Sequence, residues 1–287
     1  MTYDAGMTTT TTMTAVNSTI PTPGQTLGDL LRFWRERRRM SQLGLATEAG
    51  ISARHLSFLE TGRSRASREM VLHLGERLAV PLRAQNALLI AAGFSPVYQE
   101  RPLDDPALHG ARRAVDLILA GHEPFPALAI DRHWTLVASN AVGTRLFGAL
   151  DVAPALLDPP LNVMRLVLHP DGMGRQIVNL SQLRRHSLER LRSQVEVSAD
   201  PVLADLLDEL TGYPAGASAG PHRGIADEYG GVAVPFVVRI GDDTLSFIST
   251  TTVFGSPVDI TLSELAIETF FPLDTATGEA LRRIAEQ

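Results

Sequence analysis

The sequence predicts two domains of different class: a small all-helical domain near the N-terminus, and then a larger α+β domain built on antiparallel strands. Three observations predict this division. Helical periodicity runs with short breaks over residues 26–93, and a Pro-rich, charged stretch follows at 96–106. Segments rich in β-forming residues appear only beyond residue 124. The 287 residues are enough for two separate cores.

Composition sets the boundaries of these parts. Residues 1–24 are rich in Thr and lack a repeating apolar pattern, so we expect a disordered tail that cannot bury enough surface to fold. Residues 25–95 then form the helical domain, residues 96–106 the linker and residues 107–287 the α+β domain.

The bulk composition excludes several classes of protein. Cysteine is absent, so neither disulfides nor thiolate metal sites can form, and a reducing compartment is expected. No segment approaches the roughly 18 consecutive apolar residues of a membrane span, and the Thr-rich start does not have the pattern of a signal peptide. We therefore expect a cytoplasmic protein with no membrane partner.

Charge is divided unevenly between the two parts. The whole chain has a net charge of −6, but residues 25–95 contain eleven arginines and six acidic residues and so carry +5, which leaves −11 on the remainder. A basic N-terminal domain joined to an acidic body indicates polyanion binding confined to one end.

A pair of short helices with a glycine turn lies within the basic domain. Ser41 is placed to cap the first helix, Gly50 to form the turn and Ser52 to cap the second helix. Leu56 and Leu59 of the second helix point inward on the same side. Helix, four-residue turn, helix is the spacing of a helix-turn-helix motif.

The polar side of the second helix, residues 53–60, is the predicted contact with DNA bases. Arg54 there can donate two hydrogen bonds to guanine, which contributes about 1–3 kcal/mol of discrimination. Gln42 at the start of the first helix can hold a phosphate, and Arg63 and Arg65 can contact the backbone beyond it. The predicted DNA-binding residues are Gln42, Ser52, Ala53, Arg54, His55, Ser57, Thr61, Arg63 and Arg65.

Structural roles are the alternative for the same features. Helix pairs with a glycine turn occur in many α-rich folds, and the basic run 35–39 has the pattern of a solvated helix face. Phe58, on the outward side, either contacts a second copy or covers the next helix. Local basic charge, helix caps, the glycine turn and the polar face occur together, and this combination favours DNA binding.

The run SQLGLATEAGISARHLSFLETGRSRASREMV resembles the XRE (Cro/repressor-like) helix-turn-helix family of transcription regulators. The resemblance implies that Gln42 contacts phosphate and that the first turns of the second helix face base edges. It also implies that Glu60 is structural and ties this helix to the following loop. Ala53 is shorter than the polar residue common at its position in the family, which leaves more of the specificity to Arg54 and the residue after it.

The second domain is expected to contain five strands, with helices inserted after the second one. The predicted strands are 125–131, 134–139, 232–240, 244–254 and 262–271; the predicted helices are 110–121, 141–150, 179–197, 201–210 and 274–285.

Several segments of this domain resemble the PAS-like ligand-binding domain of MmyB-like regulators. The segments that carry the resemblance are 125–128, 134–140, 162–166, 247–252 and 264–268, and it extends over about 110–287. It implies a five-stranded antiparallel sheet with helices over one face and space for a small molecule between them.

Apolar residues alternate along two predicted strands, which gives the sheet one apolar face. A cavity over such a face favours a small hydrophobic ligand such as a fatty acid, and no other cofactor is required. Arg165, Arg184 or His186 is placed to meet a carboxylate at its mouth. The predicted ligand-binding residues are Trp134, Phe147, Met164, Arg165, Leu183, His186, Phe236 and Phe247. An ordinary core or surface role is the alternative for each of them.

Together these features predict a sequence-specific, dimeric transcription regulator whose PAS-like domain senses a small hydrophobic ligand. Its partners are then double-stranded DNA, a second copy of the chain and the ligand. One alternative is a C-terminal domain that serves only protein interaction or dimerisation. An enzyme domain is less favoured, because the eight histidines lack metal-ligand spacing and no nucleophile elbow, Walker loop or dinucleotide fingerprint is present. No catalytic or metal site is predicted.

Overall fold

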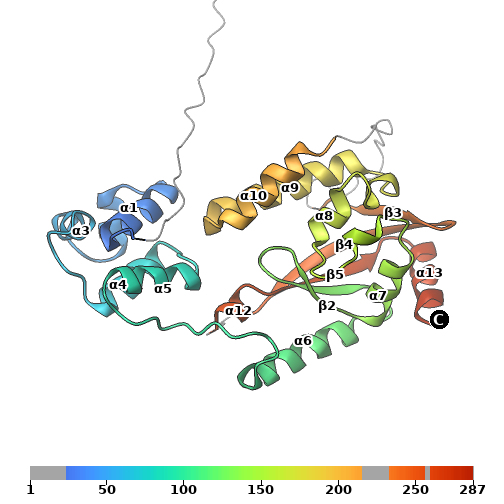
Figure 1. The fold of residues 1–287 in the computed structure, drawn as a ribbon, viewed down its shortest axis with the longest axis horizontal. Coiled ribbons are helices and arrows are strands. Elements are labelled where there is room, and N and C mark those ends of the chain that lie inside the picture. Colours follow the sequence, from blue (N-terminus) through green and yellow to red (C-terminus); the bar gives the residue numbers. More distant parts are fainter. Residues whose placement is uncertain (1–23, 215–232, 256–258, 287) are drawn as a thin grey trace, which may run out of the picture.

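The chain forms an all-helical N-terminal domain and a larger α+β domain, joined by an extended segment (Figure 1). The structure is a computed structural model that describes residues 24–214, 233–255 and 259–286. The tail expected at 1–24 lies outside these residues except for Gly24. Within the described part, no helix is long and apolar enough to cross a membrane.

The N-terminal domain packs its helices around one apolar core. Its helices are α1 (Leu27–Arg37), α2 (Gln42–Glu48), α3 (Ala53–Glu60), α4 (Arg68–Arg77) and α5 (Leu82–Ala91). Hydroxyl side chains fix where four of them begin: those of Thr26, Ser41, Ser52 and Ser67 each accept a hydrogen bond from a backbone N–H of the first turn. The fully buried side chains include Leu31, Trp34, Leu45, Leu56, Leu59, Leu74 and Leu88.

A buried ion pair ties α3 to α1. The Arg35 guanidinium donates to both carboxylate oxygens of Glu60, at 2.6 and 3.0 Å, and the Gln42 amide donates to one of them at 2.8 Å. Burial alone would raise the pKa of Glu60, but these hydrogen bonds and the charges of Arg35 and Arg32 lower it below its ordinary value. Glu60 is therefore held as a carboxylate in the domain interior.

This pair corrects two expectations from the sequence. The run 35–39 is not a solvated face, because Arg35 is buried. Glu60 is structural but does not hold the following loop. That loop instead bonds to the Phe58 carbonyl, which accepts from the N–H groups of Arg63 (2.8 Å) and Ser64 (3.2 Å). Because the Glu60 side chain points into the core, the loop is held by backbone hydrogen bonds instead.

The segment between the domains is bonded to both of them. The side chain of Asn86 in α5 accepts from the N–H of Tyr98 and donates to its carbonyl. One residue further, Gln99 pairs with Asp259 of the second domain as a parallel β-bridge. The Arg101 guanidinium lies 3.3 Å from the Asp259 carboxylate. This part of the predicted linker is therefore attached to the domains on both sides.

The second domain is built on one five-stranded sheet with every neighbouring pair antiparallel, in the order β2-β1-β5-β4-β3. The predicted α+β, PAS-like class is confirmed. The strands are β1 (Ala127–Ile130), β2 (Leu136–Ser139), β3 (Phe236–Ile240), β4 (Asp243–Val253) and β5 (Ala266–Pro272). The helices are η1 (Pro106–Leu108), α6 (His109–Gly121), α7 (Ala141–Gly148), η2 (Pro154–Leu156), α8 (Val163–Leu168), η3 (Met173–Arg175), α9 (Leu180–Ser198), α10 (Pro201–Gly212), α12 (Ile260–Ser263) and α13 (Thr275–Ala285).

Two predicted strands begin four residues later than the composition indicates. The expected strand 262–271 is preceded by α12, because the Asp259 side chain accepts from the Thr261 N–H and starts a helical turn there. The expected strand 232–240 begins at Phe236, and its residue 232 lies outside the described part.

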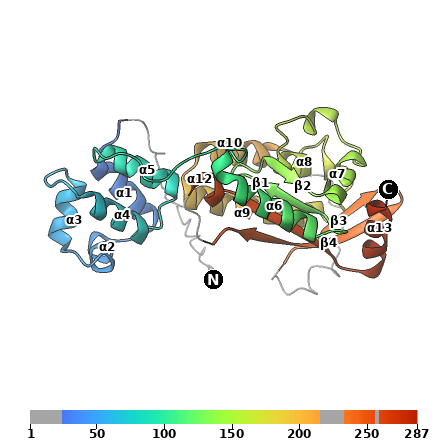
Figure 2. The same ribbon diagram turned by 90° about the horizontal axis from the view of Figure 1, so that it is seen from below.

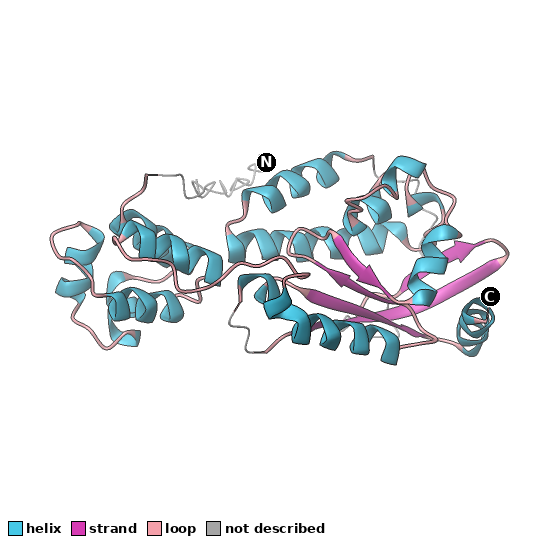
Figure 3. Cartoon of the chain, turned by 60° about the horizontal axis from the view of Figure 1, so that its bottom comes forward, coloured by secondary structure: helices cyan, strands magenta, loops and turns pink. Residues whose placement is uncertain are grey.

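Helices cover both faces of the sheet (Figure 3). On one face, Val115 and Leu119 of α6 pack against the small side chains of β1. On the other face lie α7, α8, α9 and α10, with two buried clusters between them and the strands. The second face is therefore the one with room for a ligand.

We expect Arg35→Ala to lower the free energy of unfolding of the N-terminal domain by about 3–5 kcal/mol. The substitution leaves the Glu60 carboxylate buried without its main partner, which is the costly way to break a buried pair. Hydrogen exchange of the α1 and α3 amides in the full chain measures this loss.

Arg32→Ala is the matched control. Arg32 also lies 3.7 Å from the Glu60 carboxylate, but its side chain is 47% exposed. Its removal is expected to cost about 0–1 kcal/mol. Equal losses in the two variants would contradict the role given to the buried pair.

Candidate DNA-binding surface and ligand pocket

Helix α3 lies at the end of the N-terminal domain that is remote from the sheet (Figure 2). Leu56 and Leu59 are buried and anchor it from behind. The Ser52 hydroxyl accepts from the His55 N–H at 3.1 Å and so fixes its first turn. Arg54 is exposed. Among the described residues, the polar side of α3 is therefore not in contact with the second domain.

The turn between α2 and α3 has the geometry that the motif requires. Gly50 has φ of +64°, a conformation that favours glycine. The Ile51 N–H then donates to the Ala46 carbonyl at 2.9 Å and closes the turn. Ala46 is buried and small, so the two helices cross closely. The predicted helix-turn-helix is confirmed.

Unpaired positive charges gather around α3. The Arg54 guanidinium lies over the ring of Phe58, 5.3 Å from its centre, which holds it on the outer side. Arg63 and Arg65 are exposed, and neither guanidinium has an ion-pair or hydrogen-bond partner among the residues that the structure describes. All three guanidinium groups are therefore available to an anionic ligand.

The polar side chains beside these arginines are partly engaged. Gln42 uses one amide hydrogen on Glu60, which leaves its second one for a phosphate. The Thr61 hydroxyl donates to the Ser57 carbonyl at 2.7 Å and keeps its acceptor lone pairs. The predicted DNA-binding residues thus lie on the start of α2, on α3 and on the loop after it. Their contacts with DNA remain predictions.

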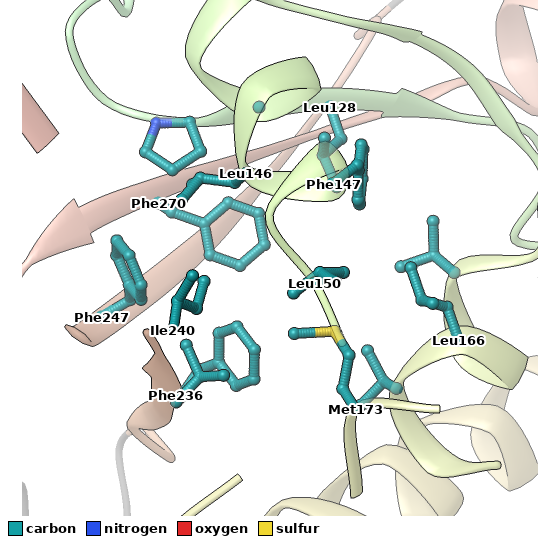
Figure 4. A pocket seen from close by; sticks show the side chains of 15 residues that line it. Leu128, Leu146, Phe147, Leu150, Leu166, Met173, Phe236, Ile240, Phe247 and Phe270 are labelled. Carbon is teal, nitrogen blue, oxygen red and sulfur yellow. The ribbon is translucent and has the colours of Figure 1, made fainter. Parts of the chain in front are cut away.

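A pocket lies between the sheet and helices α7 and α8 (Figure 4). It contains about 580 Å³ of space, part of it open to solvent. The lining residues are Pro126, Leu128, Gly143, Leu146, Phe147, Leu150, Val163, Leu166, Val167, Met173, Phe236, Val238, Ile240, Phe247 and Phe270. No lining side chain carries a nitrogen or oxygen atom, so the walls can bind only apolar parts of a molecule.

The position of α7 over the sheet depends on Asn140. The Asn140 side-chain oxygen accepts from the Gly143 N–H at 3.0 Å and from the Ala127 N–H at 3.1 Å. The Asn140 amide donates to the Phe125 carbonyl at 2.7 Å. This buried residue therefore caps α7 and joins it to β1, which sets Phe147 against the pocket.

Three phenylalanine rings form one wall of the pocket. Phe236, Phe247 and Phe270 come from the neighbouring strands β3, β4 and β5, and their ring centres lie 6.0–6.2 Å apart. Met173 and Leu150 lie across from this wall (Figure 4). Aromatic faces and a flexible thioether can adapt to apolar ligands of different shapes.

Of the eight residues predicted for the ligand site, Phe147, Phe236 and Phe247 line this pocket. Met164 and Arg165 do not. Residues 163, 166 and 167 of α8 face the pocket, so the residues between them are turned away from it. Met164 packs against α9 and α10. Arg165 pairs at 2.7 Å with Glu209, a carboxylate whose pKa is lowered by this hydrogen bond.

The other three predicted residues also lie outside the pocket. Trp134 is buried in a separate cluster, where its indole N–H donates to Gln194 at 2.8 Å and the Arg190 guanidinium lies 4.5 Å from its ring centre. Its φ of +67° in the turn between β1 and β2 directs it there, which no sequence pattern indicated. Leu183 packs against the cluster that includes the pocket walls without lining the pocket, and His186 is exposed.

Several lining residues escaped prediction. Ile240 follows the strand alternation of Phe236 and Val238, and extending this pattern by one step would have found it. The strand pattern of β5 could likewise have indicated Phe270. Met173 lies in the one-turn helix η3, outside any periodic element, and no sequence signal marks it.

Comparison with known proteins agrees with this geometry. Residues 111–284 match the family described as MmyB-like transcription regulator ligand binding domain, and residues 26–89 match one described as helix-turn-helix domain. No curated protein matches the chain.

Among solved structures, the chain is similar to "Structure of an RNA-binding Light-Oxygen-Voltage Receptor", with 13% identity and a TM-score of 0.26. The match covers 90% of this chain and 61% of that one, and is too loose to bear on fold or function. The ligand-binding match alone spans more than half of the chain. The chain is thus a DNA-binding transcription regulator with a ligand-binding domain, and it belongs to the MmyB-like family of such regulators.

Proposed function

We propose that this protein binds a specific pseudo-palindromic operator as a homodimer, and that a fatty acid or similar acyl molecule in its pocket modulates this binding. The observation that carries the proposal is the exposed polar side of α3, held from behind by Leu56, Leu59 and the buried Glu60 carboxylate. A helix fixed in this way can enter the major groove without first being freed from the rest of the chain.

Each side chain around α3 has a distinct role in the proposed complex. Arg54, near the start of the helix, reads a base pair, and Phe58 supports its guanidinium. Arg63 and Gln42 contact phosphates on either side, which positions the helix without reading sequence. Two copies related by a twofold axis place their helices in successive grooves, with half-site centres about 34–36 Å apart.

We expect Arg54→Ala to relax base preference at one position per half-site, at a cost of about 1–3 kcal/mol against the correct base. Arg63→Ala should weaken binding to all duplexes alike and lower the slope of log affinity against log salt by about 1. Gel shifts on a duplex selected from a random pool, with scrambled DNA alongside, measure both effects.

Arg113→Ala is the matched control, because Arg113 is an exposed arginine in α6 of the second domain. It should leave both affinities unchanged. An equal loss for Arg54→Ala and Arg63→Ala on selected and scrambled DNA would contradict the division of roles.

The walls of the pocket favour an acyl chain as its occupant. All fifteen lining residues are apolar, and a mostly apolar lining is typical of small-molecule sites. An ionised carboxylate is costly to bury without a partner, so the acyl chain enters first and the head group stays toward the opening. The ligand is thus expected to be amphipathic, with one polar end.

Leu146→Trp should reduce the affinity for dodecanoic acid by at least about tenfold, equivalent to about 1.4 kcal/mol, because the larger side chain occupies the pocket. Native mass spectrometry and calorimetry with dodecanoic acid measure the change. Val202→Trp, at a half-exposed position of α10, is the control for adding an indole elsewhere.

Binding of the acid to the native chain but not to Leu146→Trp supports the pocket as the ligand site. If the native chain binds no acyl chain, the ligand part of the proposal fails and a domain that only mediates dimerisation is favoured. Sedimentation of the native chain tests the dimer separately.

A further inference from the structure

The two domains meet where arginines of α1 contact the end of α9. The Arg37 guanidinium donates to the backbone carbonyls of Val195 and Glu196, the last full turn of that helix. Two residues on, the Arg39 guanidinium lies 3.3 Å from the Glu196 carboxylate. Desolvation lowers the pKa of Arg37, as is usual for a cation partly withdrawn from water.

Arg38 joins the ends of two helices from different domains. Its guanidinium donates to the Leu78 and Ala79 carbonyls after α4, each at 2.8 Å, and to the Val197 carbonyl of α9 at 3.0 Å. The last carbonyls of a helix lack intrahelical partners and carry partial negative charge. Guanidinium groups at this end are therefore both hydrogen-bonded and electrostatically favoured.

The end of α9 also enters the apolar core of the N-terminal domain. Ala199, the residue after the helix, has φ of +55° and ends it abruptly. Its side chain is buried in the same cluster as the core leucines of α1 and α4. The contact between the domains is therefore part of a packed core as well as a surface ion pair.

A second connection crosses the same junction. The Arg83 guanidinium of α5 donates twice to the Glu264 carboxylate of the second domain, each time at 3.0 Å. Glu264 also lies 3.1 Å from Arg132, which in turn lies 3.5 Å from Asp200 at the start of α10. In Figure 2, α9, α10 and α12 form the side of the second domain that faces the helical one.

Helix α9 reaches from this junction to the pocket. Its first residue, Leu180, packs against the cluster that forms the pocket walls. Midway along, Arg190 pairs at 2.6 Å with Glu268 of β5. Phe270, two residues further on the same face of β5, lines the pocket. A displacement of the pocket wall can therefore reach the carbonyls that Arg37 holds.

We infer that the C-terminal end of α9 is the docking site of the DNA-binding domain within the same chain, and that occupancy of the pocket regulates DNA binding by changing how this end holds α1. The regulatory half rests on the function proposed above, whereas the docking half does not.

The contact between α1 and the end of α9 sets the angle between the helical domain and α9, and it leaves the DNA-binding surface uncovered. Arg37 and Arg38 lie in or next to α1, while α3 lies on the far side of the domain (Figure 1). In a dimer, the angle between each helical domain and its own α9 determines the separation of the two α3 helices. A ligand that prefers one angle changes the fraction of dimers that match the operator spacing.

The absence of cysteine allows a direct test in the full chain. Glu48→Cys in α2 and Asp116→Cys in α6 place spin labels at exposed positions, one in each domain. Pulsed EPR should give one narrow distance distribution for this parent. Arg37→Glu sets a negative charge against the carbonyl end of α9 and should broaden or shift the distribution.

Arg37 is the informative position because, among the described residues, its guanidinium hydrogen bonds go to α9 alone. Within its own domain the guanidinium only lies over the Phe33 ring, 5.6 Å from its centre, so the fold of that domain should be retained. Arg77→Glu makes the same charge change on α4, at an exposed arginine whose side chain has no hydrogen-bond or ion-pair partner in the described part of the chain. It should leave the distribution as in the parent. A distribution for Arg37→Glu identical to that of the parent would overturn the docking site.

The regulatory half is tested with dodecanoic acid on the same labelled chain. The acid should shift the distribution of the parent but not that of Leu146→Trp. If the acid binds by native mass spectrometry and the distribution stays unchanged, regulation through α9 is wrong. If the acid does not bind, the proposed ligand is wrong, and comparing Leu146→Trp with the parent decides whether a filled pocket moves the domains.

Discussion

The Glu60 carboxylate, buried and held by Arg35 and Gln42, is the interaction on which the organisation of the molecule depends. It fixes the buried side of α3 to α1, so that the other side of α3 can stay polar and exposed. Helix α1 ends at Arg37, and the side chains of Arg37 and Arg38 bind the carbonyl end of α9. Because successive residues of a helix point about a third of a turn apart, α1 can hold α3 on one side and α9 on another. This short helix therefore links the DNA-binding surface to the ligand-binding domain.

The pocket depends on a different constraint, which combines the two-residue period of the strands with the three-to-four-residue spacing of a helix. At the pocket, strands β3, β4 and β5 contribute apolar residues from one face (Phe236, Val238, Ile240, Phe247 and Phe270), and α8 adds residues at spacings of three and four. Where these patterns meet, every wall is apolar, and polar side chains such as Arg165 are directed outward to partners of their own. Specificity in such a site comes from shape and from the group at its opening, because the walls have no hydrogen-bonding side chain to offer.

The sequence predicts what depends on local signals, and fails where a side chain's direction is set by tertiary structure. The sequence alone indicated the caps Ser52 and Asn140, the Gly50 turn and the succession of helices and strands along the chain, because a few adjacent residues determine each of them. The pocket was only partly readable. The phase of a six-residue helix such as α8 cannot be fixed from its own residues, and the direction of Trp134 depends on a positive φ. The basic run 35–39 was misread because most of its side-chain partners belong to other helices: Glu60 in α3, the carbonyls that follow α4, and the end of α9 more than a hundred residues away.

Charge gives the docking of the two domains a further consequence. The helical domain carries +5 and the rest of the chain −11, so DNA attracts one part and repels the other. Repulsion between solvent-exposed charges falls off over about 8 Å at physiological ionic strength. Because α9 holds the helical domain by the side opposite α3, the DNA-binding surface is the part of the helical domain farthest from the acidic body (Figure 2). A freely tethered helical domain would also sample orientations that bring the acidic body against the phosphates. Fixing the domain at α9 removes those orientations, so the contact that we assign to regulation also favours binding itself.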